Sequence, residues 1–164
     1  MNSPPTIFSQ SSLFSRVEGT FYRAVDPRYA SRAAAGSRAA GRYSSDRQPT
    51  LYLSSSQEGV EAAMTAHASR RPTGLVTVEL DLCVDQIFDL RDVEACNLAG
   101  ILLDDAMEPW QEIAAVGGVP RSWRVRERIE QLGGKGLIDP SRTSPGLWHL
   151  VLFSWNAEAR HLSN

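Results

Sequence analysis

The chain contains three short segments in a fixed order: Phe21-Tyr22-Arg23, then Gly41-Arg42-Tyr43 with Leu51-Tyr52-Leu53-Ser54 close behind, and Gly136-Leu137-Ile138-Asp139-Pro140-Ser141. Each segment places a polar or charged residue beside or at the end of a short apolar run that is typical of a β-strand. Functional side chains are commonly carried where a rigid scaffold ends in a turn or loop. The segments therefore predict strands of a central sheet, with candidate functional residues at the strand ends.

Working outward from these segments, the chain alternates strand-like and helix-like patterns. Ser55 and Glu58 form a capping box that begins a helix, and Gly133-Gly134 ends another. The predicted strands are 20–25, 50–54, 75–82, 87–90, 136–138 and 147–155, and the predicted helices are 30–35, 55–67, 92–103, 110–116 and 122–132. This mixture indicates an α+β fold in which a mixed, mostly antiparallel central sheet is flanked by helices.

The 164 residues suit one domain with a real core. Residues 1–18 are rich in Ser and Pro and are interpreted as an N-terminal arm that packs loosely or docks on a partner. Residues 19–156 form the predicted folded domain, and residues 157–164 form a C-terminal tail. There is no internal repeat and no linker between domains.

The composition excludes several classes of function. The formal net charge is -2, which makes direct nucleic-acid binding unfavourable because neutralising phosphates dominates that affinity. No apolar run is long enough to span a bilayer, so no membrane partner is expected. The N-terminus lacks a secretory signal pattern, which predicts a cytoplasmic protein and leaves export by a signal-less route open. Cys83 and Cys96 have no zinc-site spacing and are interpreted as buried apolar residues, so no metal is expected.

Arg23 and Arg42 are the candidate anion-binding residues. Arg23 ends a predicted strand, and Arg42 lies in a turn that follows Gly41. A guanidinium group offers a fixed fork of donors that matches phosphate oxygens, so the pair would suit a diphosphate. The alternative is a solvated basic loop, because residues 28–48 hold several other arginines.

Tyr52 and Ser141 complete the candidate site. The Tyr52 ring can stack on a flat heterocycle, although a core tyrosine is the simpler interpretation. Pro140 restricts the backbone next to Ser141, so its hydroxyl should be held in a definite place, and a cap or turn serine is the alternative. His67 and His149 are interpreted as structural histidines, and the four tryptophans as core or interface anchors.

These residues carry a resemblance to the RES-domain family of bacterial toxins. Tyr22-Arg23 matches the family's opening Tyr-Arg pair, and Leu51-Tyr52-Leu53-Ser54 matches its Leu-Tyr-Leu-Ala-like strand. Gly41-Arg42-Tyr43-Ser44 resembles the family's Gly-Arg-Trp-Asn, with tyrosine and serine in the last two places. Gly136 to Ser141 resembles the Gly-(Ile/Leu)-x-x-Pro-Ser segment, and an apolar strand follows at 147–153.

The resemblance covers about residues 19–154 and implies a fold similar to that of ADP-ribosyltransferases. It implies a toxin that depletes NAD by cleaving the nicotinamide–ribose bond with water or phosphate, as an NAD glycohydrolase or phosphorylase. NAD would be the substrate, with no permanently bound cofactor, and a cognate antitoxin or immunity protein would be the partner. On this reading Arg23 and Arg42 grip the diphosphate, Tyr52 packs at the nicotinamide end, and Ser141 holds a ribose or amide group.

One position departs from the family pattern. The resemblance implies a catalytic glutamate eleven residues after Tyr52, and that position is Ala63. Three interpretations stay open: a binding-only relative, a toxin inactivated by substitution, or a different register in which Glu61 or Glu79 acts. Whether the chain is an enzyme as written is therefore left open. The alternatives are a noncatalytic NAD- or ADP-ribose-binding domain, a protein-interaction module, and an ADP-ribosyltransferase that modifies a protein.

Overall fold

The computed structural model describes residues 3–66, 74–155 and 160–162. Its helices are η1 (Pro27–Ala35, a 3-10 helix), α1 (Gln57–Ala66), α2 (Val93–Ala99), α3 (Leu103–Met107), α4 (Trp110–Ala115) and α5 (Arg121–Gln131). Its strands are β1 (Thr6–Ser9), β2 (Ser15–Val25), β3 (Leu51–Ser54), β4 (Val76–Asp89), β5 (Gly136–Pro140), β6 (Trp148–Leu152) and β7 (Arg160–Leu162).

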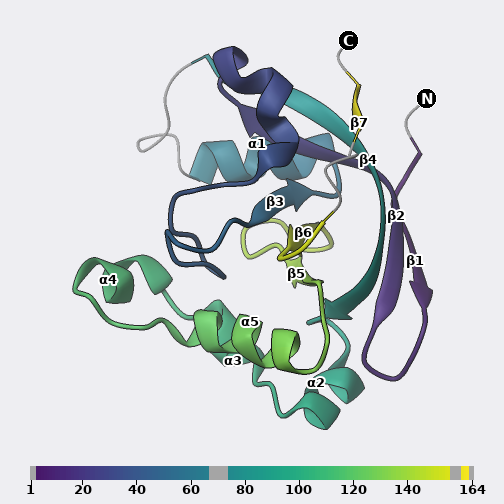
Figure 1. Ribbon diagram of the computed structural model, residues 1–164, viewed down its shortest axis with the longest axis vertical. Coiled ribbons are helices and arrows are strands. Elements are labelled where there is room, and N and C mark those ends of the chain that lie inside the picture. Colours follow the sequence, from purple (N-terminus) through teal and green to yellow (C-terminus); the bar gives the residue numbers. More distant parts are fainter. Residues whose placement is uncertain (1–2, 67–73, 156–159, 163–164) are drawn as a thin grey trace.

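The strands form one sheet in the order β1-β2-β3-β6-β5-β4-β7, and β2 pairs with β4 as well (Figure 1). The pairings therefore close a ring that runs β2, β3, β6, β5, β4 and back to β2. The β4–β5 pair is parallel, whereas the other pairs among the described strands are antiparallel. This confirms the predicted α+β fold with a mixed, mostly antiparallel sheet and flanking helices.

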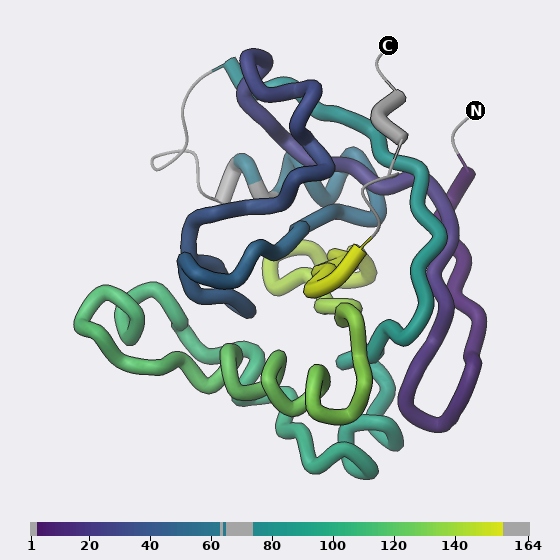
Figure 2. The backbone as a smooth tube through the Cα atoms, in the orientation of Figure 1, coloured from purple at the N-terminus to yellow at the C-terminus, as the bar shows by residue number. Residues whose placement is uncertain are grey.

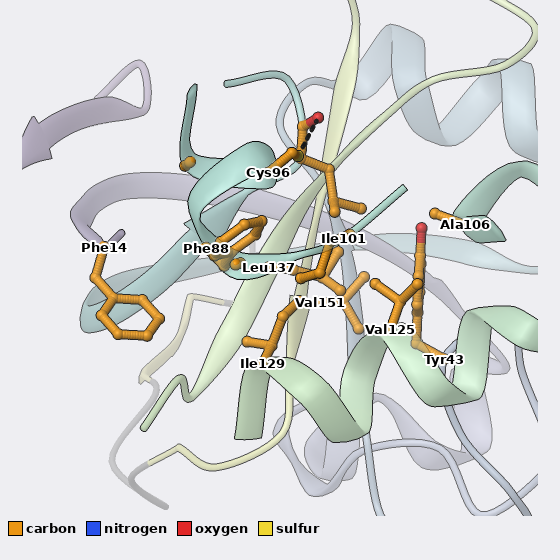
Figure 3. Close-up of a cluster of buried hydrophobic side chains, with 13 residues drawn as sticks. Phe14, Tyr43, Phe88, Cys96, Ile101, Ala106, Val125, Ile129, Leu137 and Val151 are labelled. Atoms are coloured by element: carbon orange, nitrogen blue, oxygen red, sulfur yellow. Dashed lines mark hydrogen bonds between the residues drawn. The ribbon is translucent and has the colours of Figure 1, made fainter. Parts of the chain in front are cut away.

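The apolar core has two parts, because successive side chains of a strand point to opposite faces. The first part lies inside the ring of strands and includes Phe21, Leu80 and Leu150. The second part lies between the outer face of the sheet and the helices α2, α3 and α5 (Figure 3). Leu137 belongs to this second part, whereas its neighbour Ile138 belongs to the first.

The two ends of the chain join the sheet, which differs from the arm expected at 1–18 and the tail expected at 157–164. Residues 6–9 pair with residues 15–18 as a hairpin, and β7 pairs with β4. Val17 is fully buried and Phe14 packs against the helical part of the core. The Ser- and Pro-rich composition does not predict these contacts. Both residues 15–18 and β7 pair with β4, which lies far from them in the sequence.

Several predicted boundaries shift, and two of the shifts change an element. The strands expected at 75–82 and 87–90 are one strand, β4, which pairs with β2 from Val76 to Ile87 with one register shift between Val84 and Ile87. The helix expected at 92–103 ends at Ala99, because Gly100 adopts a left-handed φ of 69°. After η1 the chain runs through residues 36–50 to β3, and this loop passes beside α5 (Figure 2).

Candidate functional site

A cleft of about 930 Å³ opens over the outer face of β3, β6 and β5. The end of β2, the loop at 40–43, part of α4 and the turn at 141–143 form its walls. The structure brings together the four predicted residues Arg23, Arg42, Tyr52 and Ser141, all of which line this cleft. A second hollow of about 720 Å³ beside α3 and α5 is lined by none of the four.

Strand alternation aims the polar side chains at the cleft. Leu51 and Leu53 point into the core inside the ring of strands, so Tyr52 between them points outward. In β6, Leu150 points into the same core, and His149 points into the cleft. The buried apolar residues therefore decide the direction of the polar ones.

Tyr52 lies against Gly41, and only a glycine fits there. A Cβ on Gly41 would lie 2.5 Å from the Tyr52 hydroxyl oxygen and 2.8 Å from its Cζ. The hydroxyl accepts a hydrogen bond from the Tyr43 backbone N–H at 3.1 Å and shares another with Ser44 Oγ at 2.7 Å. Burial raises the pKa of Tyr52, so the phenol stays neutral. The hydroxyl fixes the loop, and the ring forms part of the cleft wall.

Arg23 and Arg42 are anchored through one nitrogen each. Arg23 Nη1 donates to the Ala33 carbonyl at 2.6 Å, and Arg42 Nη1 donates to the carbonyls of Ala106 and Glu108 at 3.1 and 2.6 Å. Within the described residues, the remaining nitrogens of both guanidinium groups have no hydrogen-bond partner. Burial lowers the pKa of both arginines, but an arginine remains charged at neutral pH.

The rest of the arginine-rich segment behaves differently from Arg42. Arg28, Arg32, Arg38 and Arg47 are exposed, as the solvated-loop interpretation predicts. Only Arg42 among these five is half-buried and lines the cleft.

Helix α5 holds the backbone of the loop that carries Arg42. Trp123 Nε1 donates to the Gly41 carbonyl at 2.9 Å, and Ser122 Oγ donates to the Arg42 carbonyl. Arg126 Nη1 donates to the Tyr43 carbonyl at 3.2 Å. Three consecutive carbonyls of the loop are therefore bound by one helix, which is an arrangement that the sequence analysis missed.

Asp139, Arg142 and Tyr43 form a second group of residues that the sequence analysis missed. Arg142 grips Asp139 with two nitrogens, Nη1 to Oδ2 at 2.9 Å and Nη2 to Oδ1 at 3.1 Å. The Tyr43 hydroxyl donates to Asp139 Oδ1 at 2.7 Å, and burial raises the pKa of Tyr43 well above its ordinary value. Asp139 and Arg142 directly flank Pro140-Ser141, which the sequence analysis selected as a candidate site. Their position beside that pair was the sequence signal that could have identified them.

Ser141 lies in the cleft wall and also stabilises a turn. Its Oγ accepts a hydrogen bond from the Ser144 N–H at 3.2 Å, and its own N–H donates to the Leu147 carbonyl at 2.9 Å. The hydroxyl is therefore held in place, as expected from the sequence. Ser141 also stabilises a turn, which was the alternative interpretation.

The expected acidic position, residue 63, lies in a helix beside the cleft. Ala63 belongs to α1, but its side chain lies outside the described part of the structure, and so does His67. Val60, one helical turn before Ala63, is 3% exposed and lines the cleft. Glu61 is exposed on α1 and Glu79 lies in β4, and neither is among the described residues that line the cleft.

The cleft carries an excess of positive charge. Its described charged lining residues are Arg23, Arg42, Arg142, Asp139 and Glu112. Asp139 is paired with Arg142, and Glu112 is exposed on α4, which leaves Arg23 and Arg42 to face the cleft. The described residues contain no group of three metal-ligating side chains, and none of the described helices could cross a membrane. The arrangement favours an anionic ligand.

Comparison with known proteins gives one family. The model described as the RES domain matches residues 20–163. A crystal structure of the M. tuberculosis MbcT-MbcA toxin–antitoxin complex aligns with a TM-score of 0.56 and 16% identity, over 89% of this chain and 82% of that chain. At this identity the likeness concerns the fold. No curated protein matches the sequence.

Proposed function

This chain belongs to the RES-domain family, and we propose that it is a toxin that binds NAD in the cleft and cleaves the nicotinamide–ribose bond. The observation that carries the proposal is the convergence of Arg23, Arg42, Tyr52 and Ser141 on one cleft. They come from β2, the loop before β3, β3 and the turn after β5. Their meeting matches the four contacts that the family resemblance implies.

The size and charge of the cleft support a dinucleotide. Its volume of about 930 Å³ falls in the upper part of the roughly 300–1,000 Å³ range of small-molecule sites. Arg23 and Arg42 keep guanidinium nitrogens unused by the described protein residues, and these can bind the oxygens of a diphosphate. Burial strengthens such contacts, because charges interact more strongly away from water.

The chemistry needs stabilisation of positive charge on the ribose. Breaking the bond to nicotinamide develops an oxocarbenium-like transition state, which a nearby carboxylate stabilises. Residues three apart on a helix are neighbours on its surface, so position 63 adjoins Val60 in the cleft wall. A glutamate at position 63 would supply this carboxylate, and Ala63 cannot.

Ala63 favours a second candidate function, which is a noncatalytic domain that binds NAD or ADP-ribose. The cleft and its arginines would serve either function. A cognate antitoxin that covers the cleft is proposed for both, and it is supported by the structural neighbour, which is a toxin–antitoxin complex. The cytoplasm, where NAD and such a partner are found, is the proposed location.

The test compares the wild-type chain with Ala63→Glu. Each is incubated with NAD, free nicotinamide is followed, and ADP-ribose binding is measured by calorimetry. We expect Ala63→Glu to release nicotinamide at least about 100-fold faster than wild type, the scale of one electrostatic contact in a transition state. Arg42→Met in the same background should weaken ADP-ribose binding, whereas Arg32→Met, an exposed arginine outside the cleft lining, should not.

The outcomes separate the candidates. If neither protein releases nicotinamide but ADP-ribose binds in an Arg42-dependent way, the binding domain is correct. If neither releases nicotinamide and neither binds ADP-ribose, both functions are rejected and the protein-interaction alternative stands.

A further inference from the structure

Four neighbouring strands each contribute one polar side chain to a single row on the floor of the cleft. Tyr22 of β2 is opposite Ser54 of β3, Ser54 is opposite His149 of β6, and His149 is opposite Asp139 of β5. Residues that pair directly across strands point to the same face. All four line the cleft, and His149 lies at the centre of the row between Ser54 and Asp139.

The two ring nitrogens of His149 face different surroundings. Nδ1 lies 3.1 Å from Ser54 Oγ, and Ser54 is 6% exposed. Nε2 has no hydrogen-bond partner among the described residues. Among the described residues, Arg142 Nε is the one fully buried side-chain nitrogen or oxygen without a partner, so Nε2 of His149 is not an atom of that kind. His149 is half-buried and lines the cleft, so Nε2 is the ring nitrogen that remains for a ligand there.

His149 is the best-placed proton acceptor among the described residues of the cleft. The other candidates are two carboxylates, Asp139 and Glu112. Both oxygens of Asp139 already accept hydrogen bonds from Arg142, and Tyr43 occupies one of them as well. Glu112 lines the cleft from α4 rather than from the sheet, and it is exposed to solvent. The arginines and tyrosines of the cleft do not accept protons at neutral pH.

We propose that His149 is the general base of the cleft and that Ser54 is its positioning residue. This rests on the proposed cleavage of NAD. In this proposal Nδ1–H donates a hydrogen bond to Ser54 Oγ, which leaves the lone pair of Nε2 facing the cleft. The oxygen of a water molecule bonds to ribose C1′ while the C1′–nitrogen bond breaks. The electron pair of the broken bond leaves with nicotinamide. The proton of the water passes to Nε2 and then to solvent.

The charges around the ring favour its neutral form at pH 7. Burial lowers the pKa of His149 below its ordinary value of 6.5, and Arg142 also lowers it. Asp139, opposite on β5, raises the pKa by a smaller amount than burial lowers it. Ser54 and Tyr22 are the other members of the row. A base is active when deprotonated, so the rate should be constant near pH 7 and fall as the pH drops through this lowered pKa.

The experiment uses His149→Asn, because the asparagine side chain reaches the position of Nδ1 but not that of Nε2. It therefore keeps a partner for Ser54 and removes the base. His149→Gln is the matched variant, since its amide reaches the position of Nε2 but is not basic. Both are made in whichever of wild type and Ala63→Glu releases nicotinamide faster, and folding is checked by the thermal midpoint.

We expect either variant to lower kcat about 100-fold, the lower end of what general-base catalysis contributes. ADP-ribose affinity should change less than about twofold, and the decline in rate below pH 6.5 should disappear. Ser54→Ala should keep that decline while lowering kcat by less than the His149 variants do, since the ring stays basic but is held less firmly.

Four results would overturn the inference. The first is a folded His149 variant that keeps most of the parent rate. The second is a loss of rate matched by an equal loss of ADP-ribose affinity. The third is a decline below pH 6.5 that persists without the imidazole. In these three cases nicotinamide is still released by the parent, so the proposed function stands. Absence of release from both wild type and Ala63→Glu is the fourth, and it rejects NAD cleavage together with the base.

Discussion

Replacing Asp139 with asparagine would break the buried ion pair beside the cleft. Asp139 is 5% exposed and accepts two hydrogen bonds from Arg142 and one from Tyr43. Asparagine keeps one acceptor oxygen and loses the charge, so Arg142 stays partly buried without its counter-ion. Removing one partner of a buried pair costs about 3–5 kcal/mol. The Arg142 side chain is 23% exposed, so water screens part of this, and we expect about 3 kcal/mol.

The assay is thermal unfolding at pH 7, followed by circular dichroism. For a chain of this size, about 3 kcal/mol corresponds to a fall in Tm of roughly 6–12 °C. Asp89→Asn is the matched control, because Asp89 binds Arg91 through two nitrogens, both at 2.9 Å, in the same forked geometry. Arg91 is 37% exposed, so this pair should contribute about 0–1 kcal/mol.

The two pairs differ mainly in burial. Asp139 also accepts a hydrogen bond from Tyr43, for which the asparagine of Asp139→Asn keeps an acceptor oxygen. Equal falls in Tm for Asp139→Asn and Asp89→Asn would refute the argument. The double variant Asp139→Asn/Arg142→Met gives an independent check. It should lose less stability than the sum of the two single variants, by about 0.5–3 kcal/mol, because it leaves no unpaired buried charge.

Two further predictions follow from the loop that carries Arg42. Gly41→Ala should destabilise the chain by about 1–3 kcal/mol, because the new Cβ displaces the Tyr52 hydroxyl, and thermal unfolding measures it against Gly59→Ala, whose Cβ meets no atom closer than 3.3 Å. The raised pKa of Tyr43 means that the folded state holds its proton after the unfolded state has released it, so stability should fall as the pH rises above about 10. Denaturant titrations between pH 9 and about 11 should show a shallower fall for Tyr43→Phe, and an identical fall in both proteins would contradict the assignment.

Most strands and helices could be predicted because their signals are local. The alternation at Leu51-Tyr52-Leu53 and the Gly133-Gly134 stop need only neighbouring residues to be recognised. Tyr52 was interpreted as a core tyrosine or a stacking residue, and the structure places it in the cleft lining, between two leucines that point into the core. The N-terminal hairpin was missed because it is stabilised by pairing with a distant strand, β4, at residues 83–87.

Local sequence patterns thus predicted which segments are helices or strands and selected four polar residues near the strand ends. These patterns suffice because hydrophobic periodicity and turn residues act over a few positions. Which side chains meet is a different matter, because strand register and loop closure join distant residues. Tyr43 and Asp139 are 96 positions apart, and Ser54 and His149 are 95 apart, yet each pair is in hydrogen-bond contact. No periodicity encodes such a meeting. It arises when the ring of strands closes, which brings Tyr43 to Asp139 and Ser54 to His149. The same closure brings α5 against the loop that carries Arg42.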